Sequence, residues 1–126
     1  MYSRLSFLTL AAGLLLAGCV TGSPEDLPPN NADARVGQLL RVADSTAQAG
    51  DYAAAADLYG RASRIAPEDP APLLGLAWSR RQTGDLAGSE EAYRAALALR
   101  PESVDGLSGL GLTLILADRP AEAADM

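Results

Sequence analysis

The chain has 126 residues, and its sixteen acidic residues outnumber its ten basic ones, giving a net charge of −6. This length allows one small domain. All ten basic residues are arginine, since the sequence contains neither lysine nor histidine, which excludes imidazole catalysis, Schiff bases and lysine-based phosphate loops. One cysteine excludes an intrachain disulfide and a zinc cluster, and an acidic chain with 5% aromatic residues argues against nucleic-acid binding. We therefore expect no metal, no cofactor and no small-molecule substrate.

The first eighteen residues have the pattern of an export signal. Residues 1–4 include the positively charged Arg4, and residues 5–17 form a nearly unbroken apolar run. At about 1.5 Å per residue this run spans roughly 20 Å, less than the roughly 30 Å of a bilayer core. The pattern therefore predicts the core of a cleaved signal peptide, covering residues 1–18, and not a permanent membrane helix.

The apolar run ends in four residues that resemble a bacterial lipobox: Leu16, Ala17, Gly18 and Cys19. This resemblance implies cleavage before Cys19, a diacylglyceryl thioether on its sulfur and an acylated amine at the new terminus. Val20 follows, and because an Asp at that position favours inner-membrane retention in Gram-negative sorting, the resemblance implies anchoring at the periplasmic face of the outer membrane. The alternative is an ordinary signal peptide with a chance cysteine, cleaved a few residues later.

Residues 21–31 (TGSPEDLPPNN) form a second zone, in which three prolines exclude a helix or a packed strand. A proline-rich segment favours an extended form of about 3.1 Å per residue, so this one could reach roughly 30 Å. We interpret residues 19–32 as a lipidated cysteine and a tether that lifts the folded part off the lipid surface. The alternative is a recognition motif for a partner that binds extended proline segments.

The rest of the chain is an internal repeat. Shifting residues 36–69 by 34 positions onto residues 70–103 gives twelve identical pairs. The pairs are Leu39/Leu73, Leu40/Leu74, Ala43/Ala77, Ser45/Ser79, Gln48/Gln82, Gly50/Gly84, Asp51/Asp85, Ala53/Ala87, Tyr59/Tyr93, Ala62/Ala96, Pro67/Pro101 and Glu68/Glu102. A third, partial copy covers residues 104–126 and keeps Leu107, Leu110, Gly111 and Ala123. A period of 34 residues predicts an array of helices.

These repeats resemble the tetratricopeptide repeat. The residues that carry the resemblance are Leu39, Val42, Ala43, Gly50, Asp51, Ala55, Tyr59, Ala62 and Pro67 in the first copy, and Leu73, Leu76, Ala77, Gly84, Asp85, Ser89, Tyr93, Ala96 and Pro101 in the second. Thr46 and Arg80 depart from the pattern where an aromatic residue is usual, and Asp118 stands where the third copy should have its turn glycine. The resemblance implies an all-α solenoid of antiparallel helix pairs over residues 33–126, with two full repeats and a truncated third.

Local physics predicts the same helices. Gly50 and Gly84 can end a helix in the left-handed conformation, Asp51 and Asp85 can cap the next helix, and small residues let paired helices approach closely while Tyr59 or Tyr93 fills the remaining gap. Prolines end each second helix, and Asp69 and Ser103 can cap the helices that follow. The predicted helices cover residues 33–49, 53–66, 70–83, 87–100 and 104–117, with another starting at 120.

The third copy leaves an open end. Six large apolar residues lie in its first helix, whereas its closing segment has only residues 120–126 to cover them. The six are Leu107, Leu110, Leu112, Leu114, Ile115 and Leu116. Either the sequence is part of a longer array, or a partner or a second copy covers this surface.

The tetratricopeptide resemblance implies that the first helix of each pair lines a concave protein-binding face. The residues at those positions are Leu40, Asp44, Ala47 and Gln48 in copy one, and Leu74, Trp78, Arg81 and Gln82 in copy two. A tryptophan beside an arginine has the composition of a binding hot spot. The alternative is that Trp78 packs against the neighbouring first helix. The face lacks the basic residues of carboxylate clamps, so capture of acidic C-terminal tails is not expected.

No catalytic constellation is present in the sequence. Glu90 and Glu91 are adjacent carboxylates that should point apart on a helix and lie at the surface, and Glu68 and Asp69 should lie in a solvated loop. The layout of lipobox, tether and helical array resembles the tight-adherence (Flp) pilus assembly lipoproteins and the lipoproteins that help type IV pilus secretins multimerise. It implies a non-catalytic assembly factor with pilus or secretion components, a secretin above all, as partners. The alternatives are an envelope adaptor for peptidoglycan hydrolases or proteases, and the N-terminal part of a longer enzyme.

Overall fold

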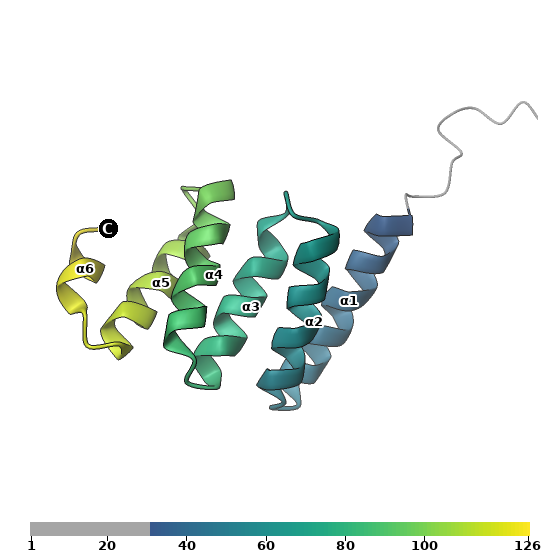
Figure 1. Cartoon of the computed structure of the whole chain (residues 1–126), viewed down its shortest axis with the longest axis horizontal. Helices are drawn as coiled ribbons and strands as arrows, with labels where there is room; N and C mark the ends of the chain where they lie inside the picture. Colours follow the sequence, from purple (N-terminus) through teal and green to yellow (C-terminus); the bar gives the residue numbers. More distant parts are fainter. Residues whose placement is uncertain (1–30) are drawn as a thin grey trace, which may run out of the picture.

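The computed structural model of the protein describes residues 31–126, which form six helices and no strand. The helices are α1 (Asn31–Gln48), α2 (Tyr52–Ile65), α3 (Pro70–Gln82), α4 (Leu86–Leu99), α5 (Val104–Leu116) and α6 (Pro120–Ala124). They stand side by side in chain order along one axis, each antiparallel to the one before (Figure 1). The predicted all-α solenoid is confirmed, and apart from α1, which begins at residue 31 instead of 33, each predicted boundary lies within one residue of the observed one.

The predictions for residues 1–30 lie outside the described residues. They include the signal peptide, the lipobox with Cys19, and most of the tether. None of the described helices combines the length and apolar character needed to cross a bilayer.

The turns between paired helices follow the predicted chemistry. Gly50 and Gly84 have φ values of 88° and 83°, in the left-handed region that glycine adopts without steric cost. Asp51 accepts a hydrogen bond from the Ala54 amide at 3.1 Å, and Asp85 accepts one from the Gly88 amide at 2.9 Å. The caps predicted between repeats are also confirmed, because the side chains of Asp69 and Ser103 accept hydrogen bonds from Ala71 and Gly106.

The third turn is built differently. Asp118 takes the place of the glycine and still adopts a φ of 61°, a conformation that is disfavoured for a residue with a Cβ. Arg119 stands at the cap position of α6 and gives that helix no side-chain cap. The last helix therefore depends on other contacts.

Small residues bring the paired helices together. Ala43 of α1 and Ala55 of α2 are fully buried, as are Ala77 of α3 and Ser89 of α4. Their short side chains leave room for close approach of the two backbones. Ser89 also meets the Thr113 hydroxyl of α5 at 3.2 Å, and Thr113 in turn donates to the Gly109 carbonyl at 2.8 Å. A threonine hydroxyl has one proton, so Ser89 must be the donor in their contact.

The two repeat tyrosines join one repeat to the next. Tyr59 and Tyr93 are 6% and 3% exposed, and each ring lies on a glycine of the following first helix. A Cβ built on Gly75 would lie only 2.5 Å from Cε1 of Tyr59, and one built on Gly109 would clash with Tyr93 in the same way. Each ring therefore fills the space between its own helix pair and the first helix of the next repeat. The sequence analysis predicts that the tyrosine fills a gap, but it does not identify the glycine of the next repeat as the other side of that gap.

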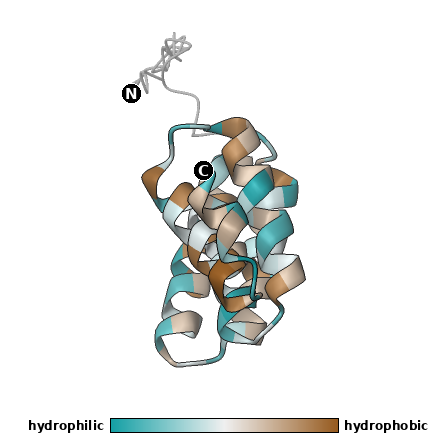
Figure 2. Cartoon of the chain, turned by 90° about the vertical axis from the view of Figure 1, so that its left-hand side faces the viewer, coloured by the Kyte–Doolittle hydropathy of each residue, from teal (hydrophilic) through white to brown (hydrophobic). Residues whose placement is uncertain are grey.

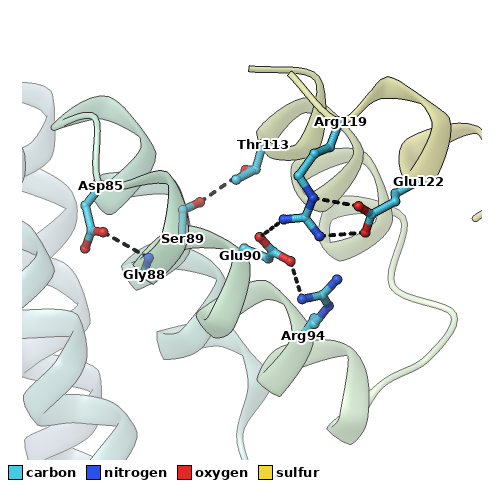
Figure 3. Close-up of polar contacts among 8 residues, drawn as sticks. All are labelled: Asp85, Gly88, Ser89, Glu90, Arg94, Thr113, Arg119 and Glu122. Carbon is cyan, nitrogen blue, oxygen red and sulfur yellow. Dashed lines mark hydrogen bonds and ion pairs between the residues drawn. The ribbon is translucent and has the colours of Figure 1, made fainter. Parts of the chain in front are cut away.

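The expectation that Glu90 lies at the surface is wrong. Glu90 of α4 is 9% exposed, and its carboxylate pairs with Arg94 one turn along the helix and with Arg119 at 2.7 Å (Figure 3). Arg119 also holds Glu122 of α6 through two hydrogen bonds of 2.6 Å, which lowers the pKa of the Glu122 carboxyl. Because Arg119 replaces the capping residue, its guanidinium can reach back to α4. Glu91 is exposed, as predicted.

The open end is apolar, as predicted, although not every residue contributes to it. Figure 2 views the array from its C-terminal side and shows hydrophobic segments there. Leu110 and Leu114 are buried inside the array at 5% and 1% exposure. The four that remain on the surface are Leu107, Leu112, Ile115 and Leu116, with exposures from 37% to 56%. Among the described residues, only the short α6 packs on the far side of α5.

Removing a tyrosine should unfold much of the array. We expect Tyr93→Ala to lower the free energy of unfolding by about 3–5 kcal/mol, because it removes a buried ring and leaves a cavity over Gly109. Glu91→Ala on the same helix should change it by less than about 0.5 kcal/mol. Urea unfolding followed by circular dichroism measures both, and equal effects would show that the 34-residue register is wrong.

The two neighbouring glutamates should also differ. Glu90→Ala leaves the guanidinium of Arg119 without one carboxylate partner, so we expect it to lower the free energy of unfolding more than Glu91→Ala does. Amide exchange in α6 should accelerate in this variant, since Arg119 joins α6 to α4. Glu91→Ala serves as the control, and the same exchange rates in both variants would contradict a role for Glu90 in holding α6.

Candidate protein-binding face

The first helices of the three repeats form one face of the array. The helix α3 packs against both α1 and α5, while α2 and α4 lie between successive first helices as the second layer. Two grooves open on this face, with volumes of about 360 Å³ and 340 Å³. The first, the α1–α3 groove, is lined by Asp44, Ala47, Gln48, Tyr52, Tyr59 and Trp78. The second, the α3–α5 groove, is lined by Leu74, Trp78, Arg81, Tyr93, Asp105, Ser108, Gly109 and Leu112.

Trp78 is common to both grooves and stands between them. Its ring meets the ring of Tyr52 edge-on, with centroids 5.2 Å apart and planes at 84°. This geometry is favourable for an aromatic pair. The ring therefore has a packing partner, but that partner is the first residue of α2 and not the neighbouring first helix that the alternative interpretation named. The residue as a whole is 36% exposed, so the ring is not enclosed by this contact.

Arg81 is held in a defined orientation at the floor of the α3–α5 groove. Its Nη1 donates to the Gly109 carbonyl at 3.2 Å, and its guanidinium lies 5.9 Å from the centre of the Tyr93 ring. Burial raises the pKa of the Tyr93 hydroxyl, although the nearby Arg81 charge opposes the shift. Asp105 lines the same groove, so this groove presents a cation and an anion beside two aromatic rings. A guanidinium has five N–H donors, which leaves Arg81 able to bind a carbonyl or a carboxylate.

Asp44 has a structural role in the α1–α3 groove. Its carboxylate accepts a short hydrogen bond from the hydroxyl of Tyr59. Burial of the ring, followed by this bond, raises the pKa of Tyr59 well above its ordinary value, so the hydroxyl remains a donor at every physiological pH. Asp44 thus orients the tyrosine that joins the first two repeats.

The predicted face residues do not all lie together. Asp44, Gln48 and Trp78 line the first groove, and Leu74, Trp78 and Arg81 line the second. Leu40 is half-buried against the core, and Gln82 is exposed but outside both grooves. The residues missed by the sequence prediction are Tyr52, Tyr59, Tyr93, Asp105, Ser108, Gly109 and Leu112. For Tyr59 and Tyr93 the missed signal was that a ring joining two repeats must also reach the face between them.

The chemistry of this face is that of a binding surface. It combines aromatic rings, apolar side chains and one oriented arginine, the residue types that dominate protein–protein hot spots. Within residues 31–126, no group of three or more potential metal ligands comes together. Such an arrangement can bind an extended or helical segment of another protein.

Comparison with known families agrees with the geometry. The tetratricopeptide repeat model matches residues 40–102 and, in a second overlapping match, residues 74–125. The second match starts 34 residues after the first, which is the period found in the sequence. No curated protein matches the chain. Proteins built from this repeat are in general non-catalytic scaffolds that mediate protein–protein interactions. With the two matches covering well over half of its length, the chain belongs to the tetratricopeptide repeat family.

Proposed function

We propose that this protein is a lipid-anchored scaffold of the cell envelope that binds a partner protein through Trp78 and Arg81. The observation that carries the proposal is the position of Trp78, which is 36% exposed between two grooves and lies one turn from an oriented arginine. Truncating a hot-spot tryptophan typically removes at least about 2 kcal/mol of binding free energy. Family membership supports a protein ligand, because tetratricopeptide repeats are protein-interaction scaffolds.

The partner that we propose is a component of a pilus or secretion apparatus, a secretin above all. The support is the layout of the sequence: a lipobox ending at Cys19, a proline-rich segment, and a short helical array. This layout resembles the assembly lipoproteins of tight-adherence and type IV pili. Val20 after the cysteine favours the periplasmic face of the outer membrane as the site of anchoring.

The anchor can be tested directly. We expect radiolabelled palmitate to enter the protein in cells and to be lost from a Cys19→Ala variant, because the thioether requires the cysteine sulfur. The variant should also leave the membrane fraction, since stable anchoring needs two or more acyl chains. A Ser23→Ala variant is the control, and labelling that survives in Cys19→Ala would contradict the lipobox interpretation.

The binding face can be tested by pull-down from envelope extracts. A Trp78→Ala/Arg81→Ala variant should lose the partner, because a loss of about 2 kcal/mol weakens affinity close to thirtyfold. The matched control is Leu99→Ala/Arg100→Ala, which removes an apolar side chain of 41% exposure and a neighbouring arginine outside both grooves. Circular dichroism should show equal helicity in all three proteins.

Three outcomes would change the proposal. An unchanged partner list with intact helicity would move the binding surface away from Trp78, most plausibly to the apolar end of α5. Loss of helicity in the double variant alone would mean that the Trp78–Tyr52 contact is needed for folding. Recovery of cell-wall hydrolases or proteases in place of pilus or secretion components would favour the adaptor alternative.

A further inference from the structure

The α1–α3 groove collects most of the aromatic side chains that the structure describes. Residues 31–126 contain four aromatic residues, and three of them, Tyr52, Tyr59 and Trp78, line this groove. The other residues that line it are Asp44, Ala47 and Gln48. The groove therefore joins aromatic rings to a single charged residue, and that residue is acidic.

Two of the rings form a corner that a ligand can reach. Trp78 is exposed and Tyr52 is half-buried, and the planes of their rings are nearly perpendicular, at 84°. The face of an aromatic ring carries negative charge density, and proteins bind alkylammonium groups between such rings. The corner therefore has the geometry of a site for an organic cation.

The aromatic corner is not a requirement of the repeat. One repeat after Tyr52 and Trp78, the equivalent positions carry Leu86 and Leu112. The helices α4 and α5, to which these leucines belong, pack together as the earlier helices do. The fold therefore accepts aliphatic residues at both positions, and the pair of rings is a feature of the α1–α3 groove alone.

A carboxylate stands opposite the tryptophan. Asp44 and Trp78 occupy the same position in successive repeats, and α1 and α3 run in the same direction, so the two residues lie at the same level across the groove (Figure 1). Asp44 is exposed, and its Oδ1 accepts the hydroxyl of Tyr59. Among residues 31–126, its Oδ2 has no hydrogen bond or ion pair. A ligand can therefore bind Oδ2 while the tyrosine contact stays in place.

No arginine lines this groove. The position that holds Arg81 in α3 holds Ala47 in α1. The guanidinium of Arg81 itself is directed into the α3–α5 groove, where it contacts Gly109 and Tyr93. The rings and the carboxylate of the α1–α3 groove are thus left without a cation of their own, in a chain whose net charge of −6 attracts cations.

We propose that the α1–α3 groove is a binding site for a basic side chain, a lysine or an arginine, of the partner protein. The charged head of that side chain lies against the rings of Tyr52 and Trp78 and pairs with Oδ2 of Asp44, while its aliphatic stem packs along the apolar wall. A groove of about 360 Å³ has room for such a side chain. The assignment rests on the proposed function, because it names the chemistry that the partner presents to one of the two grooves.

The chain has a single tryptophan, so the indole N–H signal of Trp78 reports binding in nuclear magnetic resonance titrations. The protein is the full chain with Cys19→Ser, which cannot be acylated on sulfur. The probes are the Nα-acetyl methylamides of lysine and arginine, and those of Nε-acetyl-lysine and citrulline are their neutral counterparts. We expect the dissociation constants of the basic probes to be about three- to thirtyfold lower than those of the neutral ones, because only a cation interacts with both the rings and the carboxylate.

Two variants test the residues of the site. Asp44→Asn keeps an oxygen for the Tyr59 hydroxyl but loses the charge, so it should reduce the preference for basic probes. Asp57→Asn, the same change at an exposed position of α2 outside the groove, should leave that preference unchanged. Tyr52→Leu introduces the residue type found one repeat later and should weaken the basic probes about three- to thirtyfold. Circular dichroism checks that all variants keep the helicity of the parent chain.

Equal affinities for basic and neutral probes, or equal effects of Asp44→Asn and Asp57→Asn, would overturn the proposal. Choline is a further probe, and tighter binding of choline than of both basic probes would also overturn it, because the site would then suit a quaternary ammonium head group and not a protein side chain. The titrations need neither the anchor nor the partner. A groove that binds no cation would therefore leave the pull-down test of Trp78 and Arg81 unaffected, and a failed pull-down would not alter the titrations.

Discussion

Each first helix after the first must carry a glycine where the tyrosine of the preceding repeat lies against it. The rings of Tyr59 and Tyr93 occupy the volume that a Cβ on Gly75 or Gly109 would take, which fixes how closely successive repeats approach. The other contacts between successive repeats form at the distance that these tyrosine–glycine contacts allow. The Ser89–Thr113 contact and the burial of Leu76 and Leu110 depend on it.

The same tyrosines also organise the candidate protein-binding face. The hydroxyl of Tyr59 binds Asp44, and the ring of Tyr93 lies beneath the guanidinium of Arg81. Binding groups on α1 and α3 are therefore positioned by residues of the second layer, whose main role is to hold the repeats together. The side chains that hold the repeats together therefore also shape the candidate binding face, so changes in the second layer can alter that surface.

Most of the fold could be predicted from sequence because it follows from local rules. Gly50, Gly84, Asp51 and Asp85 determine where helices end and begin within a few residues of themselves, and their roles need no knowledge of distant contacts. The period of 34 residues then indicates which helices pack against each other. The third turn is an exception. The sequence shows that Asp118 replaces the usual glycine, but it does not indicate that Asp118 still adopts a positive φ or that α6 lacks a side-chain cap.

What could not be predicted depends on pairs of residues far apart in sequence. As adjacent carboxylates on a helix, Glu90 and Glu91 are both expected at the surface. Glu90 is buried, and Arg119, twenty-nine residues later, reaches back to its carboxylate. The Tyr52–Trp78 pair likewise joins two repeats. The role of Gly75 was hidden because the first copy has Arg41 at that position, so the comparison of repeats gave no identity there. Leu40 fits the face by register but packs toward the core.

Packing that reaches only to adjacent repeats also has a consequence for how the chain reaches its native state. The helix α1 touches α2 and α3 but not α4 or α5, so contacting residues are seldom much more than one repeat apart in the sequence. Low contact order of this kind is associated with rapid folding, in microseconds to milliseconds for helical proteins. Each helix pair can consequently dock as soon as the next one becomes available. A chain that emerges from the ribosome with its N-terminus first can therefore begin to fold before its C-terminal repeat is available.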